Sequence, residues 1–127
     1  MLRALVRPLL AGIFVDGGLD AFRHPEAKAP KAEAVAPHIA APLGLPDDTV
    51  TLVRINGAAQ VVAGTLLALG RFRRLSALVL AASLVPTTLA GHRFWDEPDA
   101  RTQAQQRTHF LKNLAILGGL LLVIDGG

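Results

Sequence analysis

Ten side chains with polar or ionisable groups lie inside or beside long apolar blocks of the sequence, where such groups need a partner. The acids and the arginine could form ion pairs, the amides could bind a ligand or a neighbouring helix, and a histidine could exchange protons near neutral pH. The candidates are Asp16, Asp20, Arg54, Asn56, Gln60, His92, Trp95, His109, Lys112 and Asn113. Their chemistry is that of recognition or proton transfer, and the sequence assigns none of them a catalytic role.

Asp16 and Arg54 are the candidates for an ion pair within this group. Arg54 lies about 8 Å inside its apolar block, and Asp16 lies about 9 Å from the end of another block. A charge in hydrocarbon is costly unless it is compensated, which predicts that the two side chains pair in the protein interior. A purely structural role for this pair is an equal alternative, with Asp20 and Lys112 reaching water.

A stripe of small and polar residues runs along the second apolar block. Asn56, Gly57, Gln60 and Gly64 occupy one face of a helix, about 100° wide. Small residues let another helix approach closely, and amides can hydrogen-bond across the contact. The stripe therefore predicts either amide bonds that hold helices together or, alternatively, a ligand cavity lined by Asn56 and Gln60.

Composition and spacing disfavour other kinds of site. The sequence has no cysteine, which excludes disulfides, thiol catalysis and iron–sulfur clusters, so redox chemistry requires a cofactor or a partner. His92 and His109 belong to no HxxxH or ExxH pattern, and we predict no metal site. The net charge of +3 is spread along the connections without an aromatic-interleaved basic patch, which predicts no nucleic-acid binding.

Four apolar blocks must position these side chains, at residues 6–22, 50–70, 75–91 and 110–125. Each block is about 24 to 32 Å long as a helix, which matches the hydrocarbon thickness of a bilayer. The hydrophobic share of 51% and the mean hydropathy of +0.40 also favour a membrane protein. Because backbone groups in lipid must be hydrogen-bonded internally, the sequence predicts an all-α fold, an antiparallel four-helix transmembrane bundle that forms a single domain over residues 1–127.

The connections between these blocks carry capping, turn and kink signals. Residues 47–49 are predicted to cap the second span, and residues 31–36 to form a short helix on the membrane surface. Residues 71–74 leave room only for a tight hairpin. Pro86 removes a helix hydrogen bond, which predicts a kink in the third span. Residues 103–107, which lead into the last span, are predicted to be helical.

An up-down-up-down order brings the end of the first span, the start of the second, the end of the third and the start of the fourth to one membrane face. We therefore expect the ten candidate side chains to form one contiguous patch there. The Lys and Arg residues near the two faces number five against six. The arginine-dense loop at residues 71–74 and the two arginines ahead of the first span nevertheless predict a multi-pass protein with both termini in the cytoplasm.

Several sequence motifs resemble those of a known membrane family. The most specific are PTTLAGHRFW at residues 86–95 and HFLKN at residues 109–113, together with the run that begins LVRINGAAQ at residue 52. Over nearly its whole length the chain resembles the DoxX family of small four-helix bacterial membrane proteins, particularly its actinobacterial branch. Two features depart from that pattern: Asp20 replaces a basic residue of many distant relatives, and branch members usually continue into a polar tail beyond the position of Gly127.

The resemblance implies a helical bundle in the bacterial plasma membrane and a link to redox metabolism, through quinone-linked oxidation or through thiol and oxidative-stress enzymes. One hypothesis is a redox-associated subunit whose polar cavity holds a quinone, with His92 exchanging protons and Arg54 orienting an oxygen atom. The alternative is a non-catalytic scaffold that docks a partner enzyme through Trp95 and the adjacent loop. A cavity lined by Gln60, His92 and Asn113 would favour the first, and full packing of these residues would favour the second.

Overall fold

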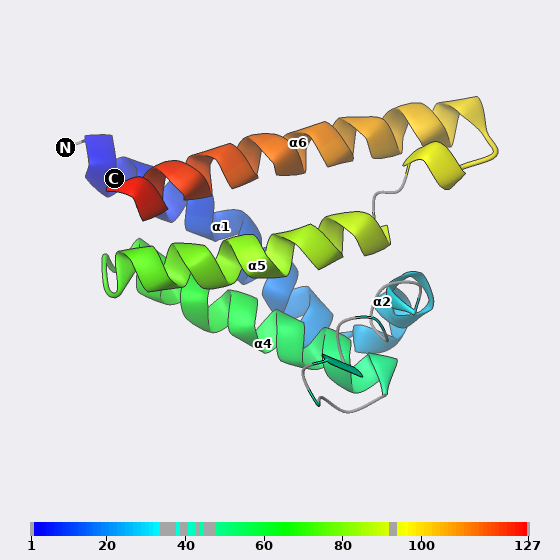
Figure 1. The fold of residues 1–127 in the computed structure, drawn as a ribbon, viewed down its shortest axis with the longest axis horizontal. Coiled ribbons are helices and arrows are strands. Elements are labelled where there is room, and N and C mark those ends of the chain that lie inside the picture. The colour runs from blue at the N-terminus through cyan, green and yellow to red at the C-terminus, as the bar shows by residue number, and fades with distance from the viewer. Residues whose placement is uncertain are drawn as a thin grey trace.

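The structure, a computed structural model, describes residues 2–33, 38, 41–42, 44, 48–91 and 94–126. The helices in this part of the chain are α1 (Leu2–Arg23), α2 (Pro25–Ala32), α4 (Thr49–Ala68), α5 (Arg73–Gly91) and α6 (Ala100–Asp125). A short 3-10 helix, η1 (Phe94–Asp96), precedes α6 (Figure 1). The described residues contain no strand, which agrees with the predicted all-α class.

Three of the helices are long and apolar enough to cross a membrane, namely α4, α5 and α6. The helix α1 has 22 residues, a sufficient length, but Arg7, Asp16 and Asp20 interrupt its apolar surface. Many large apolar side chains of the long helices point outward, for example Leu9, which is 77% exposed. Such exposure is unfavourable in water and favourable in lipid, so the finding supports a membrane protein with at least three spans.

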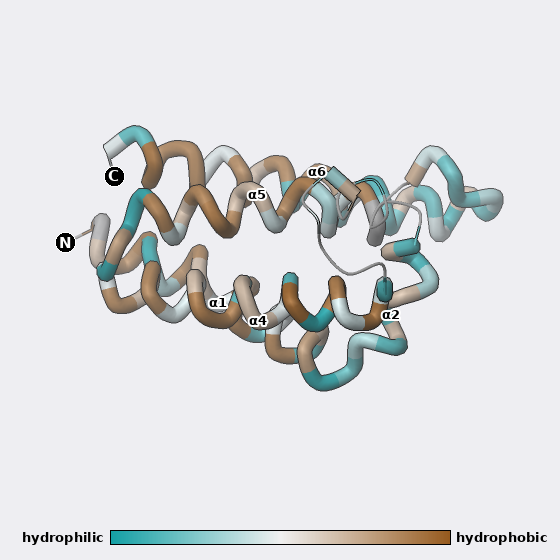
Figure 2. The backbone as a smooth tube through the Cα atoms, turned by 60° about the horizontal axis from the view of Figure 1, so that its bottom comes forward, coloured by the Kyte–Doolittle hydropathy of each residue, from teal (hydrophilic) through white to brown (hydrophobic). Residues whose placement is uncertain are grey.

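The long helices lie in two layers, α1 with α4 and α5 with α6 (Figure 2). Each runs antiparallel to the next, so the start of α1, the α4–α5 turn and the end of α6 lie at one end of the molecule (Figure 1). The core between the layers contains Phe14 of α1, Leu67 of α4, Leu80 of α5 and Leu120 of α6, all at most 3% exposed. Every long helix therefore contributes to one core.

The boundaries of two helices differ from the predicted ones. The last helix begins at Ala100, so the helix predicted at residues 103–107 is confirmed and is continuous with the span predicted from residue 110. It starts at Ala100 because the Asp99 carboxylate accepts hydrogen bonds from the Thr102 amide at 3.1 Å and from its hydroxyl at 3.0 Å. The short helix α2 begins at Pro25, since proline is favoured in the first turn of a helix. It includes the first two residues of the helix predicted at 31–36, and residues 34–36 lie outside the described part of the chain.

Other local predictions are confirmed. Asp48 caps α4 and accepts hydrogen bonds from the Val50 amide and the Thr51 hydroxyl. The α4–α5 connection is a tight turn, in which Gly70 and Phe72 have φ angles of 74° and 47°. Pro86 lies inside α5, which continues as a helix on both sides of it, and the predicted kink stays a prediction.

Candidate functional site

A hydrogen-bond network joins the polar side chains of α4 and α5. Gln60 Nε2 donates to Ser83 Oγ at 2.9 Å, and Ser83 Oγ donates to Asn56 Oδ1 at 2.6 Å. Asn56 Nδ2 in turn donates to Thr87 Oγ1 at 3.1 Å, and the Thr87 hydroxyl donates to the Ser83 carbonyl at 2.8 Å. Gln60 and Ser83 are buried. The two amides of the predicted stripe are therefore bonded to the neighbouring helix.

A similar contact joins α5 to α6. Asn113 Nδ2 donates to Thr88 Oγ1 at 3.0 Å, and the Thr88 hydroxyl donates to the Leu84 carbonyl at 2.7 Å. Asn113 is only 5% exposed. A buried amide without partners would cost free energy, so these bonds orient three helices relative to one another.

The glycines of the stripe contact α1 instead of α5. A Cβ atom placed on Gly18 of α1 would lie 2.7 Å from the Gly57 carbonyl oxygen of α4, closer than any real packing contact allows. Gly64 lies against Val15 and the Ala11 carbonyl of the same helix. The helix α4 thus uses its small residues for close approach to α1 and its amides for bonding to α5.

The predicted ion pair between Asp16 and Arg54 is not formed, although the structure describes both residues. Arg54 Nε donates to the Phe22 carbonyl at 3.2 Å, and its guanidinium lies 5.7 Å from the centre of the Phe22 ring. Asp20 pairs with Lys28 at 3.2 Å. Phe22 belongs to the last turn of α1, where backbone carbonyls lack helical partners and the helix dipole is negative. The end of α1 therefore attracts the Arg54 guanidinium through a backbone carbonyl, and no carboxylate takes part in this contact.

An aromatic cluster lies where η1 meets α6. The rings of Phe94, Trp95 and Phe110 contact one another edge to face, with centroids 5.2 to 5.7 Å apart. Trp95 is 45% exposed. The cluster fixes η1 against α6 and presents part of the indole to the surroundings.

The ten candidate residues thus separate into groups with different surroundings. Asn56, Gln60 and Asn113 belong to the interhelical hydrogen bonds, and Arg54 caps the end of α1. The predicted contiguous patch stays a prediction, because His92 lies outside the described residues. The other candidates have exposed side chains, namely Asp16, Asp20, Trp95, His109 and Lys112.

Sequence reasoning missed Ser83 as the residue that joins both amides. It also missed Thr87 and Thr88 as hydrogen-bond partners. Ser83 and Thr87 are four residues apart and therefore share one helix face, a signal that could have identified them. Among the described residues there is no cluster of three or more His, Asp or Glu side chains that could hold a metal ion.

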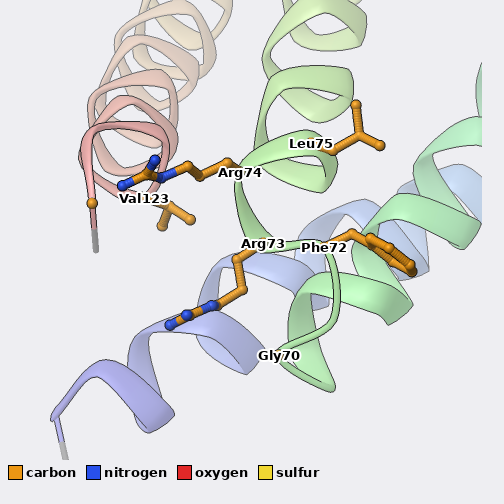
Figure 3. A pocket seen from close by; sticks show the side chains of 7 residues that line it. Gly70, Phe72, Arg73, Arg74, Leu75 and Val123 are labelled. Atoms are coloured by element: carbon orange, nitrogen blue, oxygen red, sulfur yellow. The ribbon is translucent and has the colours of Figure 1, made fainter.

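Neither the apolar groove nor the basic pocket of this structure is lined by Gln60 or Asn113. A groove of about 200 Å³ between α4 and α5 is lined by Ala59, Val62, Ala63, Leu66, Phe72, Leu75, Ser76 and Val79. A larger pocket of about 460 Å³ lies at the end of the molecule that carries the α4–α5 turn (Figure 3). Its lining residues are Gly70, Phe72, Arg73, Arg74, Leu75, Val123 and Gly126.

Comparison with known families matches residues 2–93 to the DoxX family model. This range includes α1, α4 and α5 with their interhelical contacts, and it is well over half of the chain. The chain belongs to the DoxX family. No curated protein and no solved structure matches it. In this DoxX protein the helix α6, with Asn113 and the HFLKN motif, lies beyond the matched range.

Proposed function

We propose that this DoxX protein is a non-catalytic membrane scaffold that docks a redox enzyme at the membrane face where η1 and the start of α6 lie. The observation that supports this proposal is the packing of its polar interior. Asn56, Gln60 and Asn113, which would have lined a ligand cavity, are bonded to Ser83, Thr87 and Thr88. The amide nitrogens of all three residues are used in bonds between helices, which orient the scaffold and are therefore not free to bind a quinone.

The proposed docking surface contains the aromatic cluster and the polar start of α6. This helix has 26 residues, about 39 Å, and is longer than the roughly 30 Å hydrocarbon core of a bilayer. Its first ten residues are mostly polar, and they form the hydrophilic end of the helix in Figure 2. Partly exposed tryptophan beside a polar rim is typical of surfaces that bind another protein.

The proposal also specifies the membrane location and the topology of the scaffold. We place it in the bacterial plasma membrane as a four-helix bundle, with α1 as the fourth span and both termini in the cytoplasm. The resemblance of PTTLAGHRFW and HFLKN to the actinobacterial branch supports the link to redox enzymes. Because the chain has no cysteine, a partner enzyme would have to carry out any thiol chemistry.

Purification of the full chain in mild detergent tests the proposal. We expect a thiol-linked or oxidative-stress enzyme to copurify with the wild type, and Trp95→Ala to reduce its recovery at least tenfold, because a central aromatic contact is worth about 2 kcal/mol or more. Phe72→Ala, which removes an exposed aromatic ring at the opposite end, is the matched control and should leave recovery unchanged.

Mass spectrometry of the same preparations tests the quinone alternative. A stoichiometric quinone that is lost in Gln60→Leu or Asn113→Leu, without loss of the folded protein, would contradict the scaffold proposal. Equal loss of the enzyme in Trp95→Ala and Phe72→Ala would contradict the proposed docking surface.

A further inference from the structure

The larger pocket lies at the membrane face opposite the proposed docking surface and plays no part in it. The first residues of α5 form one side of it, and the last turn of α6 forms another. In Figure 3, Arg73 extends toward α1 and Arg74 toward the end of α6. Two guanidinium groups therefore border one opening.

The described residues provide no carboxylate in the lining of this pocket. Its lining contains two arginines and no acid, and among the described residues neither Arg73 nor Arg74 lies within 4.0 Å of a carboxylate oxygen. Asp125, next to the lining residue Gly126, is exposed and does not itself line the pocket. The first turn of α5 adds the positive end of a helix dipole. The last turn of α6 contributes the negative end of its own dipole, so the attraction of the pocket for an anion rests on the two arginines.

A third arginine lies beside the pocket. The guanidinium of Arg7 covers Gly70, where an added Cβ would be 2.7 Å from Arg7 Nη1. Arg7 Nε is buried and has no hydrogen-bond partner. Gly70 also has a φ of 74°, so the turn favours a glycine at this position, whereas the Arg7 guanidinium is the end of a flexible side chain. A third positive charge therefore lies next to the turn that borders the pocket.

Apolar side chains complete the lining. Phe72 and Leu75 are 69% and 60% exposed, and Val123 contributes from α6. In Figure 3, Phe72 and Leu75 point away from the two guanidinium groups. The volume of about 460 Å³ falls within the roughly 300 to 1,000 Å³ of small-ligand sites. A charged opening with an apolar flank fits a molecule that has a phosphate at one end and hydrocarbon at the other.

We propose that this pocket binds the phosphate headgroup of an anionic phospholipid, with Arg73 and Arg74 contacting the phosphate and Leu75 contacting the start of an acyl chain. Arginine suits this role because its planar fork matches phosphate oxygens. Basic pockets between transmembrane helices bind such headgroups on the cytoplasmic side, where the anionic lipids are concentrated. The apolar flank favours a lipid over free phosphate.

Native mass spectrometry of the full chain in detergent, titrated with phosphatidylglycerol or phosphatidylcholine, tests the proposal. We expect the first phosphatidylglycerol to bind at least tenfold more tightly than phosphatidylcholine. The double variant Arg73→Gln/Arg74→Gln should weaken it about 30-fold, the equivalent of about 1 kcal/mol for each charge. Arg101→Gln/Arg107→Gln, which removes two exposed arginines at the start of α6, is the matched control and should change it less than threefold.

Two further measurements keep the proposal falsifiable. Arg73→Lys/Arg74→Lys retains the charge and should preserve the preference for phosphatidylglycerol, although with weaker binding. Millimolar inorganic phosphate should not displace the lipid, and displacement would indicate a free-anion site instead. Equal binding of the two lipids by the wild type, or equal losses in the two glutamine variants, would overturn the proposal. The lipid preference of the wild type decides the question even if a variant fails to fold.

Discussion

Ser83 is the residue on which the α4–α5 contact depends most directly. Its hydroxyl accepts a hydrogen bond from Gln60 and donates one to Asn56. We expect Gln60→Leu and Ser83→Ala to be coupled by about 0.6 to 1.7 kcal/mol, which are the average and the largest values measured for interhelical hydrogen bonds by double-mutant cycles in one membrane protein. A double-mutant cycle on unfolding in mixed detergent measures this coupling. Strictly additive losses would mean that the bond contributes nothing.

Asp99 is the residue whose protonation should affect the start of α6. Hydrogen bonds from the Thr102 amide and hydroxyl lower the pKa of the Asp99 carboxyl below its ordinary value. Because the folded pKa is depressed, the stabilisation is complete above the ordinary aspartate pKa of about 3.9 and is lost as pH falls through the lower folded value.

An NMR titration of the Thr102 amide checks this expectation. Its midpoint should lie below about 3.9, and Thr102→Ala, which keeps the amide but removes the hydroxyl, should raise it. A midpoint at the ordinary aspartate pKa in the wild type would contradict the assigned cap.

At the scale of elements, the contact between α1 and α4 depends on backbone approach at Gly18 and Gly57. A Cβ at either position would overlap a backbone carbonyl oxygen of the other helix, whereas a Cβ at Gly17 would meet nothing within 4 Å. We expect Gly18→Ala to destabilise the fold by about 1 to 3 kcal/mol, the usual cost of overpacking.

Gly17→Ala is the matched control, since it adds the same methyl group to the same helix one residue away. We expect it to be neutral or slightly stabilising, because alanine favours helix more than glycine does. Thermal or denaturant unfolding of both variants makes the comparison. Similar losses in both would show that α1 does not approach α4 at Gly18.

At the scale of the whole molecule, the antiparallel order of the long helices makes a topology prediction. The α4–α5 turn and the start of α6 lie at opposite ends (Figure 1). Because the chain has no cysteine, single cysteines can be introduced without a background. We expect Arg71→Cys to be labelled from the cytoplasm and Ala100→Cys from the outside. Both positions are exposed and therefore accessible to a labelling reagent. Ser76, which is also close to the turn, is buried and would be a poor labelling position.

Two further single cysteines test whether α1 crosses the membrane. The start of α1 and the end of α6 lie at the same end of the molecule, so Leu2→Cys and Gly126→Cys should be labelled from the same side. Labelling from opposite sides would mean that α1 does not cross the membrane and that only α4, α5 and α6 are spans.

The sequence by itself determined the elements of this protein. The lengths of the apolar blocks predict the long helices, and Asp48 predicts the start of α4, because helix formation and capping depend on residues that are neighbours in the chain. The stripe of Gly57 and Gln60 already indicated that α4 has a close-packing face. Family membership likewise follows from sequence, over residues 2–93.

Only the tertiary structure decided which groups meet. Arg54 bonds to the Phe22 carbonyl and not to Asp16, Ser83 joins the two amides, and the basic pocket lies at the far end. These outcomes depend on the rotation of each helix about its axis. Helices that are apolar on most sides have no single face that fixes this rotation, so it is set by backbone approach at glycines and by the hydrogen bonds of a few buried polar side chains.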